Sequence, residues 1–240
     1  MKDGDKVSIK SNIEYITNLK NEAAIRSGRK PEDVLLVAVT KLHTPAEMNE
    51  AIDAGITDIG ENKVQEIMDK YDSVKPVRWH LIGHLQTNKV KYIIDKVSMI
   101  HSVDSFKLAK EIDKRAQQHN LTMDILVQVN SAMEESKFGI TTDETDQLIK
   151  QIAEECPNIR IRGLMCIAPF AEDPNDSRVY FSEVKKIFDK YVENKTDKVD
   201  FKYLSMGMTN DFEVAVEEGS NLIRVGTAIF GYRDYAKEEK

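Results

Sequence analysis

The sequence predicts a (β/α)₈ barrel of the α/β class, in which parallel strands close into a ring surrounded by helices. The first observation is that short apolar runs, rich in β-branched residues, alternate with longer segments of helical periodicity, which implies a parallel sheet. The second is that this alternation occurs eight times in 240 residues, near the roughly 250 residues of a typical barrel. The third is the lack of a linker rich in Gly, Ser or Pro, so we expect one domain over residues 1–240.

A helix is expected before the barrel. Between residues 8 and 27, apolar side chains recur at helical spacing, and Gly28 then ends the helix. The recurring residues are Ile9, Ile13, Ile16, Leu19 and Ala23. Because this segment precedes the first strand, we expect an extra N-terminal helix outside the eight repeating units.

The eight repeating units follow one another along the rest of the chain. The runs predicted as strands are residues 34–40, 56–60, 78–83, 98–103, 123–130, 159–165, 201–207 and 221–226. The helices that follow them are expected to begin near Pro45, Asn62, Thr87, Ser105, Asp143, Ser177, Thr209 and Thr227. Eight such units in a chain of this length fit a closed barrel better than an open sheet.

The composition excludes several classes of protein. A net charge of -7 and a pI of about 5.4 do not fit a nucleic-acid-binding surface, which needs clustered Lys and Arg. No apolar stretch is long enough to span a bilayer, and the N-terminus "MKDGDKVSIK" has no apolar signal core. The two cysteines, Cys156 and Cys166, do not suggest a disulfide framework, so we expect a cytosolic location without membrane or nucleic-acid partners.

Reactive and small polar residues collect at the expected ends of the strands, where barrels of this kind carry their active sites. Lys41 follows the first apolar run. The segments "SMG" and "VGT" end the seventh and eighth runs, which brings Ser205, Gly207, Gly226 and Thr227 to the same rim. Glycine lets the backbone approach an anion, while hydroxyl and N–H groups donate to it. The two loops therefore suggest a phosphate site, although each glycine could serve only a tight turn.

A lysine that can form an imine, opposite a phosphate site, suggests pyridoxal 5'-phosphate (PLP) as the cofactor. The aldehyde would bond to Lys41 and the phosphate would lie at the two glycine loops. Arg224 comes two residues before Gly226 and so points into the same interior, where it could donate to the ring nitrogen. An arginine there keeps that nitrogen unprotonated and makes the cofactor a poor electron sink. The plainer alternatives are a solvent-exposed lysine and an arginine paired with a carboxylate.

Longer motifs resemble a known family. These motifs are "AVTK", "GENKVQE", "WHLIGHLQTNK", "GLMCIAPF" and "SMGMTNDFEVAVEEGSNLIRVGTAIFG". Together they are similar to the pyridoxal phosphate homeostasis proteins, single-domain relatives of the N-terminal barrel of alanine racemase, from about residue 8 to Gly231. The resemblance implies a fold-type III barrel with a Schiff base at Lys41. It also implies that the cofactor site is lined by Asn62, Ser205, Gly207, Arg224, Gly226 and Thr227.

The resemblance implies a carrier rather than a catalyst. The family is thought to bind and hand over PLP, so we expect cofactor storage and transfer by a monomer, with PLP-dependent apo-enzymes as recipients. The chain ends soon after "GTAIFG", where racemases and decarboxylases of this fold type continue into a second, β-rich domain, and we therefore expect no efficient catalysis. Two alternatives stay open: a weak amino acid racemase on the same barrel, and a Schiff-base aldolase acting on a sugar phosphate.

The other candidate residues have weaker signals. His80 and His84 have the spacing of a helical metal pair, but residues four apart in a strand lie about 13 Å from each other. We expect no metal site, and one of these histidines near the cofactor or capping the next helix. Lys137 is either a second amine near the mouth of the barrel or an exposed loop lysine. Cys166 is expected in the core, with a catalytic thiol as the alternative.

Overall fold

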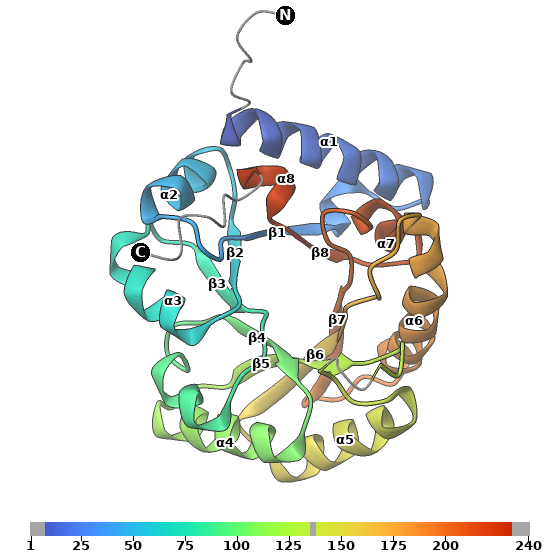
Figure 1. Cartoon of the computed structure of the whole chain (residues 1–240). Helices are drawn as coiled ribbons and strands as arrows, with labels where there is room; N and C mark the ends of the chain where they lie inside the picture. The colour runs from blue at the N-terminus through green and yellow to red at the C-terminus, as the bar shows by residue number, and fades with distance from the viewer. Residues whose placement is uncertain (1–7, 135–137, 232–240) are drawn as a thin grey trace, which may run out of the picture.

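The computed structural model describes residues 8–134 and 138–231, and in this part of the chain parallel strands close into a barrel with helices outside (Figure 1). Each strand pairs with the next in sequence, and the last pairs with the first. The strands are β1 Leu35–Val39, β2 Asp58–Glu61, β3 Arg78–Leu81, β4 Met99–Val103, β5 Met123–Val129, β6 Ile159–Cys166, β7 Val199–Ser205 and β8 Leu222–Val225. The predicted fold class is therefore confirmed.

The helices follow the strands as expected, with one correction. They are α1 Ile9–Arg26, α2 Pro45–Asp53, α3 Val64–Lys70, α4 Phe106–Gln118, α5 Thr142–Glu155, α6 Arg178–Glu193, α7 Phe212–Glu217 and α8 Thr227–Phe230. The predicted helix from Thr87 is present, as Thr87–Tyr92, but it is a 3₁₀ helix rather than an α-helix. Val90 is the buried residue of this helix, and Ile93 and Ile94 are buried just after it. The i→i+3 hydrogen bonds from Lys89 to Gln86 and from Ile93 to Val90 are those of a 3₁₀ helix, which is usual for so short a connection.

The starts of the helices depend on local capping. Thr44 accepts from the N–H of Glu47 and its own N–H donates to the Glu47 side chain, which forms a capping box just before Pro45. At α7 the helix begins at Phe212, later than the predicted Thr209, because Asp211 accepts from the backbone N–H of Met208 and the preceding residues form a turn. This turn forms one wall of the candidate site.

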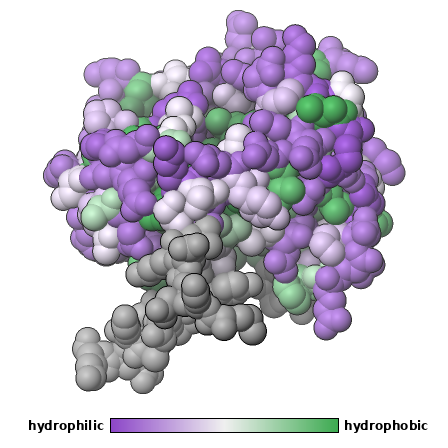
Figure 2. All heavy atoms as spheres, turned by 90° about the horizontal axis from the view of Figure 1, so that it is seen from above, coloured by the Kyte–Doolittle hydropathy of each residue, from purple (hydrophilic) through white to green (hydrophobic). Residues whose placement is uncertain are grey.

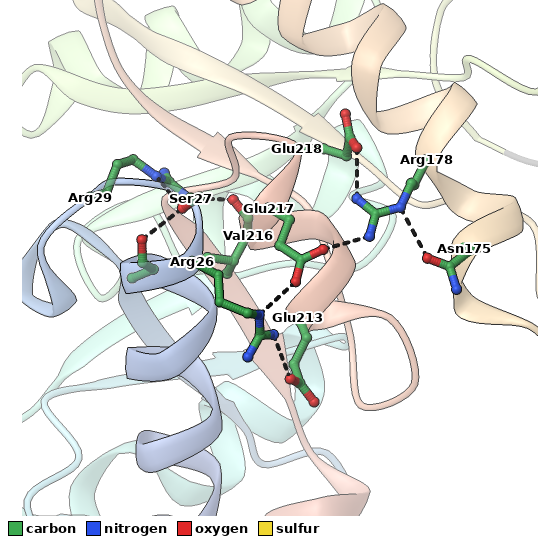
Figure 3. A network of polar contacts seen from close by, with 10 residues as sticks. Arg26, Ser27, Arg29, Asn175, Arg178, Glu213, Val216, Glu217 and Glu218 are labelled. Carbon is green, nitrogen blue, oxygen red and sulfur yellow. Dashed lines mark hydrogen bonds and ion pairs between the residues drawn. The ribbon is translucent and has the colours of Figure 1, made fainter.

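The extra N-terminal helix α1 is confirmed, and it packs against α7 and α8. Figure 3 shows the polar contacts that hold α7 from two sides. On one side, Arg26 of α1 binds Glu213 and Glu217, both at 2.9 Å. On the other side, Arg178 of α6 binds Glu217 at 2.5 Å and Glu218 at 2.8 Å. The helix that follows the loop after β7 is thus fixed to two neighbours.

The apolar core lies between the strands and the surrounding helices. On the face shown in Figure 2, hydrophilic residues predominate and hydrophobic ones are scattered among them, as on most globular proteins. Within the described residues, none of the helices is both long and apolar enough to cross a membrane.

The interior of the barrel holds a continuous chain of buried polar side chains, which we call the interior chain. Asp58 Oδ1 on β2 lies 2.8 Å from His80 Nε2 on β3. His80 Nδ1 lies 2.9 Å from His101 Nε2 on β4, and His101 Nδ1 lies 3.2 Å from Ser205 Oγ on β7. Ser205 Oγ in turn accepts from Arg224 Nη1 on β8 at 2.5 Å. Each residue of this chain is at most 3% exposed.

The charges at the two ends of the interior chain fix the direction of its hydrogen bonds. Burial acts to raise the pKa of Asp58, but hydrogen bonds, first that from His80, outweigh it and lower the pKa, so the group is a carboxylate. Burial, with nearby His80 and Arg224, lowers the pKa of His101 well below its usual value, so this ring is neutral and has one N–H. Ser205 accepts from Arg224, which can only donate, and therefore donates to His101 Nδ1. His101 Nε2–H then donates to His80 Nδ1, and His80 Nε2–H donates to Asp58. If His101 Nδ1–H instead donated to Ser205, the Ser205 hydroxyl hydrogen would have no acceptor among the residues of the interior chain.

The neutral state of His101 makes a prediction about the pH dependence of stability. Because its pKa is lower in the folded state, the unfolded chain binds an extra proton below about pH 6.5, and the free energy of unfolding falls as the pH falls through that window. The expected slope from this one group is at most about 1.4 kcal/mol per pH unit. Urea denaturation of the wild type and of His101→Asn at pH 7.5 and pH 5 should show a smaller loss for the variant. The exposed His119 is the control, since His119→Asn should keep the wild-type slope, and equal slopes for all three proteins would contradict the assignment.

Candidate functional site

A pocket of about 420 Å³ opens at the carboxyl ends of β1, β6, β7 and β8. The segment after β6, residues 167–171, supplies much of its apolar wall. Its polar wall is made by Lys41, Ser177, Thr209, Asn210, Asp211, Arg224 and Thr227. The pocket therefore combines a primary amine, a guanidinium and hydroxyl groups on an otherwise apolar surface, as is usual for a small-molecule site.

Lys41 reaches the pocket from the turn that follows β1. The strand ends at Val39, whose side chain also lines the pocket, and Thr40 is fully buried behind it. Lys41 itself is partly buried. The expectation that this lysine simply turns back to solvent is not supported by its place on the pocket wall.

Arg224 forms the inner end of the pocket and the upper end of the interior chain. Its Nη1 donates to Ser205 Oγ and its Nη2 donates to the backbone carbonyl of Cys166 at 3.0 Å, so two contacts fix the plane of the guanidinium. Burial lowers the pKa of Arg224 to about 10, so the group is still a cation at neutral pH. The alternative of an arginine paired directly with a carboxylate is not what the structure shows, since its hydrogen bonds go to a hydroxyl and a carbonyl.

Gly226 and Thr227 lie on the pocket wall where β8 passes into α8. A Cβ atom added to Gly226 would lie 3.1 Å from the backbone oxygen and Cβ of Val39, so glycine is what allows β8 and β1 to stay this close at the pocket. The backbone N–H groups of the first turn of a helix have no intrahelical acceptor. In α8 the N–H groups of Ile229 and Phe230 donate to the Gly226 carbonyl, so a ligand oxygen at this place would meet the Thr227 N–H and hydroxyl.

Three predicted site residues do not line this pocket. Ser205 is fully buried and lies below Arg224, in the interior chain. Gly207 has φ of +92°, and a Cβ there would lie 2.7 Å from Ala215 Cβ, so its visible role is to let the β7 loop pack on α7. Asn62 lines a separate, smaller pocket with His84. The structure thus brings together Lys41, Arg224, Gly226 and Thr227 and leaves these three outside.

Two wall segments were missed from the sequence. Residues 208–211 form the wall after β7, and Thr209 and Asn210 supply polar groups there. The segment "SMGMTND" held the signal, because the residues next to a glycine-bearing strand end share its loop, but only Ser205 and Gly207 were singled out. The segment after β6 gave no polar signal, and its Phe170 is 82% exposed at the mouth.

The remaining candidates have clear positions. His80 belongs to the interior chain, whereas His84 stacks on Phe138 with ring centroids 4.0 Å apart and lies 3.9 Å from Asp104. Cys166 is fully buried, as expected of a core residue, and its sulfur lies 3.3 Å from Ser131 Oγ. Lys137 lies outside the described residues.

The chain is similar to known proteins over most of its length. Residues 16–234 match the family described as "Alanine racemase, N-terminal domain". The pyridoxal phosphate homeostasis protein of Aquifex aeolicus is 41% identical over 216 residues, which cover 89% of this chain and 93% of that protein.

Solved structures of similar fold and sequence agree with this family match. A crystal structure of an unknown protein from Bifidobacterium adolescentis has a TM-score of 0.88 at 33% identity, covering 96% of this chain and 98% of the other. PipY of Synechococcus elongatus, in a structure with PLP bound, has a TM-score of 0.75 at 32% identity, covering 89% of this chain and 99% of that one. With a family match over most of its length and a 41% identical relative, the chain belongs to the alanine racemase N-terminal domain family, among the pyridoxal phosphate homeostasis proteins.

Proposed function

We propose that this protein binds pyridoxal 5'-phosphate in the pocket beside Lys41 and acts in its homeostasis, by holding the cofactor and releasing it. The observation that carries the proposal is that an amine, a buried cation and a glycine-bearing turn with a hydroxyl line one pocket, although they come from opposite ends of the chain. The name of the Aquifex aeolicus relative and the PLP bound to PipY support the choice of ligand.

The residues present fit the three chemical parts of this cofactor. When bound, PLP supplies an aldehyde carbon that condenses reversibly with primary amines. Lys41 offers such an amine on the pocket wall. Gly226 and Thr227 offer a surface without a side-chain obstruction and with hydroxyl and N–H donors, which suits a phosphate. The apolar segment after β6, residues 167–171, offers an apolar wall for the ring.

Arg224 favours a role in carrying the cofactor over a role in catalysis. A guanidinium has donors but no acceptor, so a ring nitrogen placed against Arg224 must accept and stays unprotonated. The interior chain holds this guanidinium from below, through Ser205, and so keeps its plane fixed. An unprotonated ring withdraws electrons weakly, and holding the cofactor is then favoured over chemistry at a bound amino acid.

The proposed role also includes the recipients of the cofactor, the location of the protein and its oligomeric state. We propose PLP-dependent apo-enzymes as recipients, because they are the proteins that require this cofactor, and a cytosolic location, because Cys156 and Cys166 are both free thiols. We also propose that the chain acts as a monomer.

The first test concerns the covalent bond. Reduction with borohydride should attach PLP permanently to Lys41, because only an amine on the pocket wall can meet the aldehyde while the phosphate is held. Peptide mapping by mass spectrometry should find the label on Lys41 and should find none in Lys41→Ala. A label mainly on Lys89 or Lys137 would contradict the site.

The second test concerns the phosphate. Gly226→Ala places a methyl group in tight contact with Val39 at the pocket wall. The affinity for PLP should fall by at least about tenfold, which corresponds to the loss of one hydrogen bond to a charged group. The affinity for pyridoxal, which lacks the phosphate, should fall by less than about threefold. Fluorescence titration with both ligands measures this difference, and an equal loss for the two would mean that Gly226 serves only the fold.

The third test concerns storage. Alkaline phosphatase destroys free PLP, and the loaded protein should protect its cofactor because the phosphate lies against the backbone of the pocket. After the phosphatase is inhibited, an apo-aminotransferase should regain activity from the protected cofactor. Loss of PLP at the same rate with wild-type protein, with Lys41→Ala and with no protein would contradict a storage role.

A further inference from the structure

Lys41 lies in a tight turn that its own sequence does not favour. The carbonyl of Thr40 accepts from the N–H of His43 at 3.1 Å, so residues 40–43 form a β-turn with Lys41 and Leu42 at its central positions. Leu42 has φ of +64°, a conformation usual for glycine and costly for leucine. Its side chain is 47% exposed, so burial of that side chain does not account for the conformation. The surroundings of the turn must supply the constraint.

A buried ionic cluster supplies it, made of Lys70, Glu61 and Glu66, which we call the Lys70 cluster. Lys70 Nζ donates to Glu61 Oε1 at 3.0 Å, to Glu66 Oε2 at 2.7 Å and to the carbonyl of Thr40 at 3.2 Å. An ammonium group has three hydrogens, and these three acceptors take all of them. The Thr40 carbonyl thereby accepts from both Lys70 and the turn itself.

The cluster also holds the other side of the turn. The backbone N–H of Leu42 donates to Glu66 Oε2 at 2.5 Å. The peptide unit before the Cα of Lys41 is therefore held through the Thr40 carbonyl, and the peptide unit after it is held through the Leu42 N–H. Thr40 Oγ1 adds a hydrogen bond to Glu61 at 2.7 Å, so the cluster grips the end of β1 as well.

The burial of the cluster shows that stability alone does not explain it. Glu61 is fully buried and Lys70 is 9% exposed. Burial raises the pKa of Glu61, while hydrogen bonds from Lys70 and Leu42 lower the pKa of Glu66 although burial acts to raise it. Replacing such a buried ion pair by packed apolar residues is often neutral or stabilising, so a well-formed pair that touches backbone on both sides of one residue indicates a task at that residue.

We propose that Lys70, Glu61 and Glu66 are positioning residues that fix the two peptide units flanking Lys41 and so direct its amine into the pocket. What Lys41 bonds to rests on the proposed function, but the fixed turn does not. The two can therefore be tested separately, by a measurement on the backbone and a measurement with PLP.

The backbone measurement is hydrogen–deuterium exchange at the amides of Leu42 and His43 in the protein without cofactor. Lys70→Met removes the three donors and keeps the length of the side chain, and it should speed exchange at both amides. Lys185→Met is the matched control, since it breaks an exposed lysine–aspartate pair with Asp189 on α6 and should leave these amides unchanged. Unchanged exchange in a folded Lys70→Met protein would overturn the proposal.

A second pair of variants decides the question if Lys70→Met does not fold. Glu66→Gln replaces the charged acceptor of the Leu42 N–H by a neutral one and should speed exchange at Leu42. Glu61→Gln changes a carboxylate that contacts Thr40 and Lys70 but not Leu42, and should leave that amide slower than in Glu66→Gln. Equal exchange at Leu42 in these two variants and the wild type would overturn the proposal in the same way.

The measurement with PLP follows the rate of absorbance change when cofactor is added. Lys70→Met should slow attachment by about tenfold, the effect expected when a strained turn is no longer held. Leu42→Gly should restore part of that rate in the double variant, because glycine takes positive φ without help. A merely structural role would give no such rescue, and its absence would count against positioning. If wild-type protein takes up no PLP, the proposed function fails while the exchange result still stands.

Discussion

A guanidinium buried on the axis of the barrel is the constraint on which much of this structure depends. Arg224 is 3% exposed and still carries its charge at neutral pH, so it needs acceptors that the barrel itself supplies. A hydroxyl on β7 and a carbonyl at the end of β6 meet it directly, and the imidazoles of His101 on β4 and His80 on β3 connect the hydroxyl to a carboxylate on β2. Four further strands, β2, β3, β4 and β7, thus place polar side chains where a barrel would otherwise carry apolar ones. These polar side chains replace apolar packing at the centre of the fold. They hold the Arg224 cation in a fixed orientation at the floor of the pocket.

The sequence predicted those parts of the fold and the site that depend on neighbouring residues. Alternating apolar runs and helical segments predicted the barrel, and glycine or lysine at the ends of strands predicted that Lys41, Arg224, Gly226 and Thr227 would meet. Ser205 was placed on the correct rim but lies inside the barrel, because its direction depends on the register of β7 against its neighbours. The contact between His80 and His101 joins two strands, and nothing local in either strand specifies it. The Lys70 cluster was missed for the same reason, since an exposed lysine and a buried one look alike in sequence.

The two ends of the proposed site are held by different physical means. At Lys41 the structure fixes a backbone turn, through ionic groups that lie outside the pocket behind β1 and β2. At Arg224 it fixes a side chain, through hydrogen bonds that run down the inside of the barrel. Both sets of contacts are made within the protein, so the positions of these two wall residues are set before any ligand arrives. Preorganisation of this kind lowers the entropy that a ligand must lose on binding.

The burial of Cys166 has a consequence for the selectivity of the proposed aldehyde chemistry. Its carbonyl binds Arg224 and the next residue, Ile167, lines the pocket, so a thiol lies one residue from the wall proposed for the cofactor ring. Sulfur attacks carbon as thiolate, and burial raises the pKa of Cys166 while Ser131 engages its sulfur from the side. The thiol therefore stays protonated and directed into the core. A competing thiohemiacetal is excluded at the one cysteine near the site, and the aldehyde carbon is left to nitrogen.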